Sequence, residues 1–73
     1  MMSDQASRLL RSFGQRYVTL HRGPRESVAG YLMGLVYHAR DPWSDPVLCF
    51  LLEGEAGITH IPIHHVTELT RED

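Results

Sequence analysis

The sequence predicts a mainly β protein in which a short N-terminal helix precedes a five-stranded small barrel. Three observations predict this fold. Apolar residues recur at helical spacing up to Gly14 and at strand spacing after it. Turn residues then divide the rest of the chain into short extended segments. A chain of 73 residues is long enough for one hydrophobic core. Residues 1–73 are therefore expected to form one domain. The alternative arrangement is an open five-stranded sheet with the helix on one face.

The helix is predicted over residues 4–13, where four apolar residues share one stripe of its surface. These residues are Ala6, Leu9, Leu10 and Phe13. Ser3 is placed to cap the N-terminus, and Gly14 is placed to end the helix in the left-handed conformation. Because one short stripe does not stabilise an isolated helix, we expect the helix to lie across the core that the strands build.

Five extended segments make up the barrel, which is predicted over residues 15–69. The segments are residues 15–22, 28–38, 47–52, 58–63 and 67–69. The second segment carries Gly30 and Gly34, and two glycines within a strand permit a close approach of another backbone and a sharp bend. Residues 41–46 contain two Asp-Pro steps, which favour a loop between the second and third segments.

The last part of the chain is interpreted from Pro62 onward. Proline has no N–H to donate to a ladder, so the fourth segment is expected to lie at an edge of the sheet or to end there. Residues 64–66 are typical of a single helical turn that leads into the fifth segment. Residues 70–73 are predicted to be a flexible tail.

The charge is divided unevenly along the chain. Residues 1–40 hold six arginines and two carboxylates, whereas residues 41–73 hold one arginine and seven carboxylates, so the net charge of −2 hides a basic half and an acidic half. This division suits a basic patch for an anionic partner, complementary faces that meet in a homo-oligomer, or two solvated faces. A chain this small also buries little surface, which makes self-association an expectation.

The composition also bears on the compartment. Cys49 is the only cysteine, so no disulfide can form within the chain and a reducing cytosol is favoured. The first residues lack the apolar stretch of a signal peptide, and the longest apolar runs are too short to cross a bilayer. We therefore expect a cytoplasmic protein with no membrane role.

Part of the chain resembles a known family. Residues 25–36 (RESVAGYLMGLV) resemble the first Sm motif with its G-x-L-x-G form, and Asp41 and residues 47–52 stand where that motif has an Asp-containing loop and an apolar third strand. Residues 61–69 resemble the second half of Sm-like barrels, in which strand, single turn and strand run together. An N-terminal helix occurs in Hfq-like members, and the helix-plus-barrel pattern also resembles the Rof-like antiterminators that bind Rho.

The resemblance implies an Sm-like barrel that binds RNA, or a protein that handles RNA or acts in transcription, and that forms a homo-oligomer. It also implies a role for His64, which falls close to where Hfq-like proteins carry a Lys-His pair, although the Lys is missing here. The second Sm motif usually has a basic or polar base-contacting group, and Pro62 and Ile63 stand near that place in this chain.

The residues favoured for contact with RNA or a protein partner are four arginines, one tryptophan and one histidine. They are Arg16, Arg22, Arg25, Arg40, Trp43 and His64. The arginines border the first hairpin and are expected to form one phosphate-facing patch. Trp43 lies in a polar loop, where it either folds back over the barrel mouth or stays exposed as a partner anchor or base-stacking platform. The tyrosines at positions 17, 31 and 37 are assigned to the core or the rim.

The sequence shows no residue pattern of an enzyme. It has neither a nucleophile elbow nor a glycine-rich phosphate loop. Cys49 lies in an apolar run and is expected to be a small buried hydrophobe, while Asp41 and Asp45 are expected to cap turns. We therefore expect a protein without catalytic activity and without a cofactor.

Three histidines come nearest to a metal site: His60, His64 and His65. In a continuous strand, His60 and His64 would stand roughly 13 Å apart at about 3.3 Å per residue, too far for one zinc ion bound at about 2 Å per ligand. A turn after Ile63 would shorten that distance, and His38 or Asp41 could join. No metal site is predicted, and the alternatives are a histidine-based metal- or small-ligand-binding protein and a purely structural subunit of a homo-oligomer.

Overall fold

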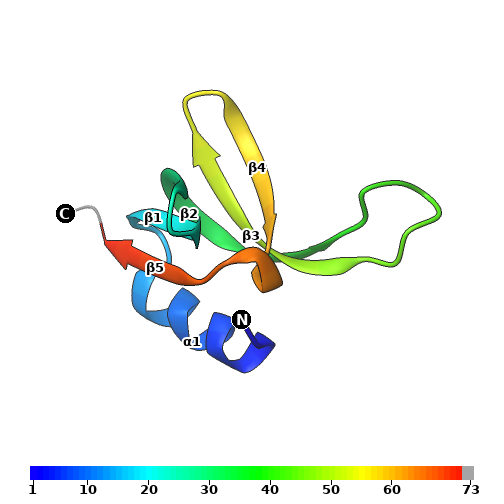
Figure 1. The fold of residues 1–73 in the computed structure, drawn as a ribbon, viewed down its shortest axis with the longest axis horizontal. Helices are drawn as coiled ribbons and strands as arrows, with labels where there is room; N and C mark the ends of the chain where they lie inside the picture. The colour runs from blue at the N-terminus through cyan, green and yellow to red at the C-terminus, as the bar shows by residue number, and fades with distance from the viewer. Residues whose placement is uncertain (72–73) are drawn as a thin grey trace.

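The computed structural model describes residues 1–71, which form one α-helix, one short 3-10 turn and five strands (Figure 1). In chain order these are α1 (Ser3–Phe13), β1 (Tyr17–Gly23), β2 (Glu26–His38), β3 (Val47–Gly54), β4 (Gly57–Pro62), η1 (Ile63–His65) and β5 (Glu68–Arg71). Each of the five predicted segments overlaps one strand. The predicted class, a short helix followed by mainly β structure, is therefore confirmed.

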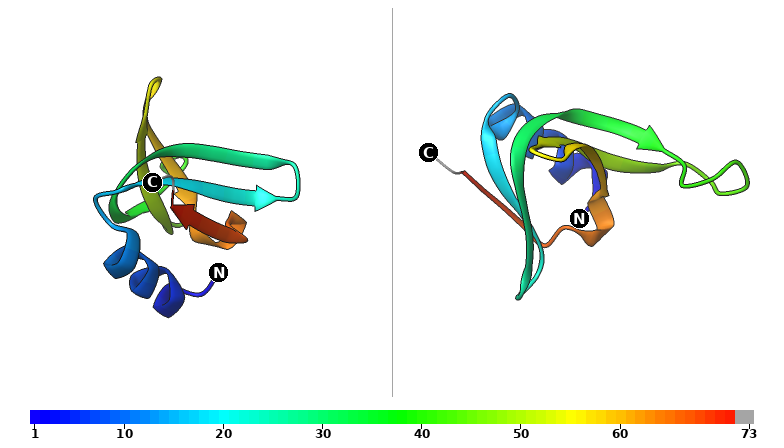
Figure 2. Two further views of the ribbon diagram at one scale, coloured as in Figure 1. Left: turned by 90° about the vertical axis from the view of Figure 1, so that its left-hand side faces the viewer. Right: turned by 90° about the horizontal axis from the view of Figure 1, so that it is seen from above.

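The five strands form one antiparallel sheet in the order β4-β3-β2-β1-β5. β4 and β5 are its two edges, and they run apart from η1, the turn between them (Figures 1 and 2). The sheet is bent but not closed, which corrects the closed form of the predicted barrel. Thr67 starts β5 along β1, because its N–H and hydroxyl both donate to the carbonyl of His21, at 2.8 and 3.0 Å, and the other edge of β5 pairs with no strand among residues 1–71.

The core brings together apolar side chains from every strand, from η1 and from α1. Its buried members are Ala6, Val18, Leu20, Leu32, Phe50, Leu52, Ile61, Ile63, Val66 and Leu69. The predicted apolar stripe of α1 faces this core, since Ala6 is fully buried and Leu9, Leu10 and Phe13 pack against the cluster. The helix therefore lies across the core as expected, because it buries there the stripe that cannot stabilise it alone.

Both ends of α1 differ from the predicted capping. Ser3 is the first helical residue, and the N-cap position belongs to Met2, which makes no side-chain capping bond. Gly14 has φ −60°, while the left-handed residue is Gln15 with φ 60°. Gly14 instead donates its N–H to the Leu10 carbonyl at 2.7 Å, and a Cβ at Gly14 would collide with that same oxygen. Among residues 1–71, no helix is both long and apolar enough to cross a membrane.

The two glycines of β2 have separate roles. A Cβ at Gly30 would lie 2.7 Å from the Glu53 carbonyl oxygen and 2.9 Å from Cγ of Leu52, so only glycine allows β3 to approach this closely. A Cβ at Gly34 would meet nothing within 4 Å. Gly34 instead follows the shift in register between β2 and β3, where one extra residue bends β2. The close approach and the bend that the sequence predicts are thus both present, at different glycines.

The end of the chain follows the prediction closely. Pro62 is the last residue of β4, and β4 is an edge strand. η1 begins one residue earlier than the predicted turn. β5 includes Thr70 and Arg71, which the sequence places in a flexible tail, and residues 72–73 of that predicted tail lie outside the described residues.

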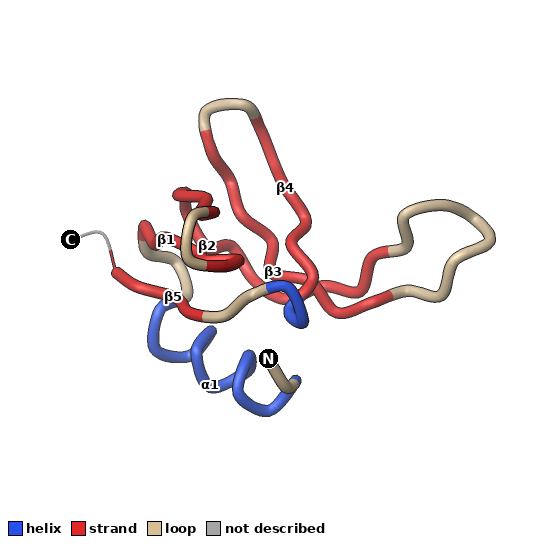
Figure 3. The backbone as a smooth tube through the Cα atoms, viewed as in Figure 1, coloured by secondary structure: helices blue, strands red, loops and turns tan. Residues whose placement is uncertain are grey.

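The ends of β2 and β3 extend beyond the rest of the sheet and carry a long loop, residues 39–46 (Figure 3). We call residues 37–48 the arm. β1 pairs with β2 only as far as Tyr31, and β4 pairs with β3 only from Cys49 onward, so the arm strands pair only with each other. The arm extends along the longest dimension of the molecule, which measures 39 Å against 28 and 25 Å (Figure 1).

Candidate functional site

A groove of about 620 Å³ lies where the arm meets the end of β4 and η1. We call it the histidine groove, because four of the five histidines of the chain line it. These are His38, His60, His64 and His65. The other lining residues are Arg40, Ser44, Asp45, Val47, Cys49, Ile58, Thr59 and Pro62. A groove of this size is large enough for a small ligand or a nucleotide.

Strand register places two of the histidines on one face of the sheet. Cys49 of β3 stands between Val36 of β2 and Pro62 of β4. His38 lies two residues from Val36, and His60 lies two residues from Pro62. Because residues two apart in a strand share a face, both imidazoles are on the face of Cys49. Their rings stack with centroids 4.0 Å apart and planes inclined by 13°.

The other two histidines come from η1. The predicted turn after β4 is present, and it brings His64 and His65 to the groove instead of continuing the strand. Their rings meet edge to face with centroids 4.3 Å apart and planes at 71°. The separation of His60 and His64 expected for a continuous strand therefore does not apply. His38 of β2 also lines the groove, which the sequence analysis allowed.

Side chains of metal-ligand type gather here without forming a metal centre. Within the described part of the chain, no group of three or more His, Cys, Asp or Glu side chains is arranged to hold one metal ion. The near-parallel stack of His38 and His60 is one cause, since stacked rings direct their nitrogens sideways rather than toward a common point. The structure therefore gives no support to the predicted metal-binding alternative.

Polar partners are missing around the groove. Among residues 1–71, none of the four imidazole rings makes a hydrogen bond or an ion pair, and neither does the guanidinium of Arg40. The fifth histidine differs, because Nε2 of His21 on β1 lies 3.3 Å from Oγ1 of Thr70 on β5, at the edge of the sheet opposite β4. The groove therefore offers several hydrogen-bond donors that no other described residue uses.

Trp43 is held in an exposed position at the end of the arm. Oδ1 of Asp41 accepts hydrogen bonds from the Trp43 N–H at 2.9 Å and from the Ser44 hydroxyl at 3.0 Å, which fixes a tight turn. The Trp43 side chain is 90% exposed, so the interpretation in which it folds back over a barrel mouth is wrong. Asp41 caps the turn as predicted, whereas Asp45 lines the histidine groove.

The arginines do not form the single patch that the sequence predicts. Arg22 and Arg25 lie at the turn that precedes β2, and Arg40 follows its far end, so the thirteen residues of β2 separate them. Arg16 lies between, with its carbonyl accepting the N–H of Leu32 at 3.0 Å. The arginines are spread out because β2 continues from the hairpin into the arm. Residues before and after this long strand are close in the sequence but far apart in the molecule.

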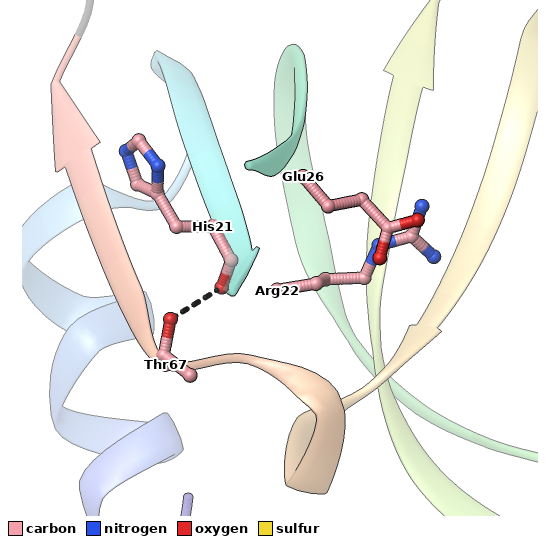
Figure 4. A network of polar contacts seen from close by, with 4 residues as sticks. All are labelled: His21, Arg22, Glu26 and Thr67. Atoms are coloured by element: carbon pink, nitrogen blue, oxygen red, sulfur yellow. Dashed lines mark hydrogen bonds and ion pairs between the residues drawn. The ribbon is translucent and has the colours of Figure 1, made fainter. Parts of the chain in front are cut away.

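Arg22 is also engaged within the protein. Its Nε lies 3.7 Å from Oε2 of Glu26 across the β1–β2 turn, and Figure 4 shows the two side chains next to each other. The same figure shows the bond from Thr67 to the carbonyl of His21 at the other side of β1. Arg22 therefore contributes to the structure of the turn, and Arg25 beside it is exposed.

The aromatic residues and Cys49 divide between surface and core. Tyr17 is 64% exposed and packs edge to face against Tyr31, while Tyr37 is 73% exposed on the arm, so neither Tyr17 nor Tyr37 is a core residue. Cys49 is 1% exposed, which confirms the predicted buried hydrophobe, and burial raises the pKa of its thiol. A thiol with a raised pKa is less often the nucleophilic thiolate.

A second, smaller groove went unnoticed in the sequence. It lies between β1, β2 and the β3–β4 turn, and it is lined by Tyr17, Ala29, Gly30, Glu53, Gly54, Glu55 and Gly57. Its charged side chains are both carboxylates, so it repels phosphate. No sequence pattern could reveal it, because its lining comes from turns and strands that only the register brings together.

Two of the six predicted contact residues thus line one groove, and a third is the chain neighbour of a lining residue. Arg40 and His64 line the histidine groove, and Trp43 precedes Ser44, which also lines it. The site can hold an anion through cationic and N–H donors and a planar group through the exposed indole. Comparison of the chain with protein-family models, curated proteins and solved structures found no match.

Proposed function

We propose that this protein is a non-enzymatic module that binds single-stranded RNA through the arm and the histidine groove. The observation that carries the proposal is that Arg40 and His64 line one groove, whose lining also includes Ser44, the chain neighbour of the exposed Trp43. Binding of single strands requires a stacking surface for bases beside donors for phosphates, and the arm and the groove together supply both. The proposal extends the resemblance of residues 25–36 and 61–69 to Sm-like barrels, which implies RNA binding.

Trp43 supplies the stacking surface. Its indole is 90% exposed, and the turn capped by Asp41 holds its backbone in place. An ordered but uncovered indole loses little conformational entropy when a base stacks on it. Base stacking on such a ring contributes about 1–3 kcal/mol per base without preference for sequence.

Arg40 and the imidazoles supply the phosphate contacts. The Arg40 guanidinium has no ion-pair partner among residues 1–71, so binding a phosphate does not require an existing pair to break. Within residues 1–71, Asp45 is the only carboxylate that lines the groove. The second half of the chain is acidic, but it contributes histidines to the histidine groove. Two of its carboxylates, Glu53 and Glu55, line the smaller groove instead.

Replacing Trp43 with alanine is expected to weaken binding of a short unstructured RNA about 5- to 150-fold, the equivalent of about 1–3 kcal/mol of base stacking. Replacing Arg40 with alanine is expected to reduce the slope of log affinity against log salt concentration by about 0.7, because one phosphate contact is lost. Fluorescence anisotropy of the labelled RNA at several salt concentrations measures both effects.

The matched controls lie outside the arm and the histidine groove. Tyr17→Ala removes an exposed aromatic ring beside the acidic groove, and Arg8→Ala removes an exposed arginine of α1; both variants should bind RNA like the parent chain. If Trp43→Ala binds RNA as tightly as the parent, the arm is not the RNA-binding site. If the parent chain binds no RNA, or binds it with an affinity that does not respond to salt, the proposed function fails. Retained binding of an RNA-handling protein would then identify the chain as an adaptor.

A second candidate function, assembly of identical subunits, is favoured by the open edges of the sheet. β4 and β5 each pair with one strand only, so each presents a row of backbone N–H and C=O groups without a strand partner among residues 1–71. Exposed edges of this kind pair readily with another chain. Because β4 and β5 occupy opposite edges, antiparallel pairing of β4 with β5 of the next copy would link subunits head to tail.

The native mass from light scattering after size exclusion is therefore expected to be several times the 8.3 kDa of one chain. Ile58→Lys places a charge on the exposed edge strand β4 and should reduce this mass toward that of one chain, since edge lysines oppose strand pairing. Met33→Lys adds the same charge to a partly exposed residue of the interior strand β2 and should leave the mass unchanged. A parent chain of 8.3 kDa at every concentration would contradict assembly.

A further inference from the structure

The histidine groove collects five groups that can carry positive charge. Four imidazoles and the Arg40 guanidinium line it, contributed by β2, the arm loop, β4 and η1. Among the described residues, Asp45 is the one carboxylate that lines the groove with them. From β3 the groove receives the thiol of Cys49, whose pKa is raised by burial, so it adds no negative charge.

Two features indicate an anion as the ligand rather than a cation. The imidazole and guanidinium side chains make no hydrogen bond or ion pair with one another or with any other described residue, so their N–H groups are available. The stacked rings of His38 and His60 are 4.0 Å apart, and protonation of both would place two positive charges at that distance. An anion bound beside the stack would offset this repulsion, and in turn it would favour the protonated rings.

We propose that the histidine groove binds a phosphate group. Arg40 would provide the permanent charge and the paired donors that match phosphate oxygens, and the imidazoles would add N–H donors. The phosphate can belong to RNA or to a free nucleotide or inorganic phosphate. If the phosphate belongs to RNA, this inference rests on the proposed function. If it belongs to a free nucleotide or to inorganic phosphate, the inference does not depend on RNA binding.

Sulfate is the probe because it remains a dianion, whereas phosphate changes charge with a pKa of about 6. We expect the affinity for sulfate to fall as the salt concentration rises, because salt screens the attraction between the anion and the Arg40 guanidinium. The side-chain NMR resonances of the four groove histidines should shift with sulfate, and those of His21 should not, because His21 lies against Thr70 at the edge of the sheet opposite β4.

Variants of equal charge change show whether the groove itself is responsible. Arg40→Ala should weaken sulfate binding about tenfold through loss of the permanent charge and its donors. Arg8→Ala removes the same charge from α1 and should have no effect. Equal shifts at His21 and the groove histidines, or equal weakening in Arg8→Ala and Arg40→Ala, would overturn the proposal by showing unspecific attraction.

Comparing sulfate with RNA separates the phosphate site from the proposed function. If sulfate binds the groove and RNA does not bind at all, the oxyanion site stands and the proposed RNA function fails. If RNA binds while the NMR resonances of the groove histidines do not shift with sulfate, RNA binding stands and the proposed oxyanion site is wrong. An RNA with a 5′-phosphate that binds more tightly than the same RNA with a 5′-hydroxyl would identify a terminal phosphate as the occupant, whereas equal affinities would assign the groove to the internal phosphates.

Discussion

Replacing Phe50 with alanine is expected to lower the free energy of unfolding by about 3–5 kcal/mol, the usual cost of removing a fully buried phenylalanine ring. Phe50 is 0% exposed and lies on the central part of β3, where it stands opposite Leu35 of β2 and Ile61 of β4. A chain of this length has a total stability of about 4–11 kcal/mol, at about 0.05–0.15 kcal/mol per residue. The substitution should therefore remove a large share of the total stability, and the variant should be partly unfolded at room temperature if the parent chain lies near the lower limit.

Urea unfolding followed by far-ultraviolet circular dichroism measures this loss. Tryptophan fluorescence is a poor probe here, because Trp43 is exposed in the folded state as well. Tyr37→Ala is the matched control, since it removes an aromatic ring that is 73% exposed on the neighbouring strand and should change stability by less than about 0.5 kcal/mol. Equal stabilities of the Phe50 and Tyr37 variants would mean that the core is not centred on β3.

Replacing Gly30 with alanine is expected to destabilise the protein by about 1–3 kcal/mol, the usual cost of an added methyl group without space. The new Cβ would lie 2.7 Å from the carbonyl oxygen of Glu53. That oxygen belongs to the backbone of β3, so it cannot move aside as a flexible side chain could. β2 and β3 would have to separate, which weakens the pairing of Tyr31 with Glu53.

Gly34→Ala is the matched control in the same strand and should have the opposite sign. A Cβ at Gly34 has no atom within 4 Å, and its φ is not in the left-handed region. Replacing such a glycine should stabilise the fold by about 0.4–1 kcal/mol, because the unfolded chain loses conformational freedom. Urea unfolding of both variants decides the matter, and destabilisation of both to the same extent would show that the contact with Glu53 does not limit the spacing of β2 and β3.

The candidate site was only partly predictable from the sequence. Arg40, Trp43 and His64 could be selected by residue type and by the turn residues around them. Their grouping could not, because it depends on the register that places β2, β3 and β4 side by side. The stack of His38 on His60 shows this well, since twenty-two positions separate the two residues and no local pattern connects them.

The prediction of a single arginine patch was wrong for the same reason. Arg22, Arg25 and Arg40 are close in the sequence and share one hairpin, so they were expected on one surface. Neighbours along an extended strand move apart by about 3.3 Å per residue, and β2 has thirteen residues. A patch inferred from nearness in sequence is reliable across a turn and unreliable along a strand.

The sequence by itself determined the local structure of this protein. The change of hydrophobic period at Gly14, the Asp-Pro loop and the position of Pro62 identified the helix, the arm and the edge strand, because period, proline and turn residues act through neighbouring backbone. The tertiary structure alone decided that the sheet stays open and that four histidines share a groove. Those outcomes depend on strand register and on bonds between distant residues, such as that from Thr67 to His21, and contacts of that range leave no periodic trace in a sequence.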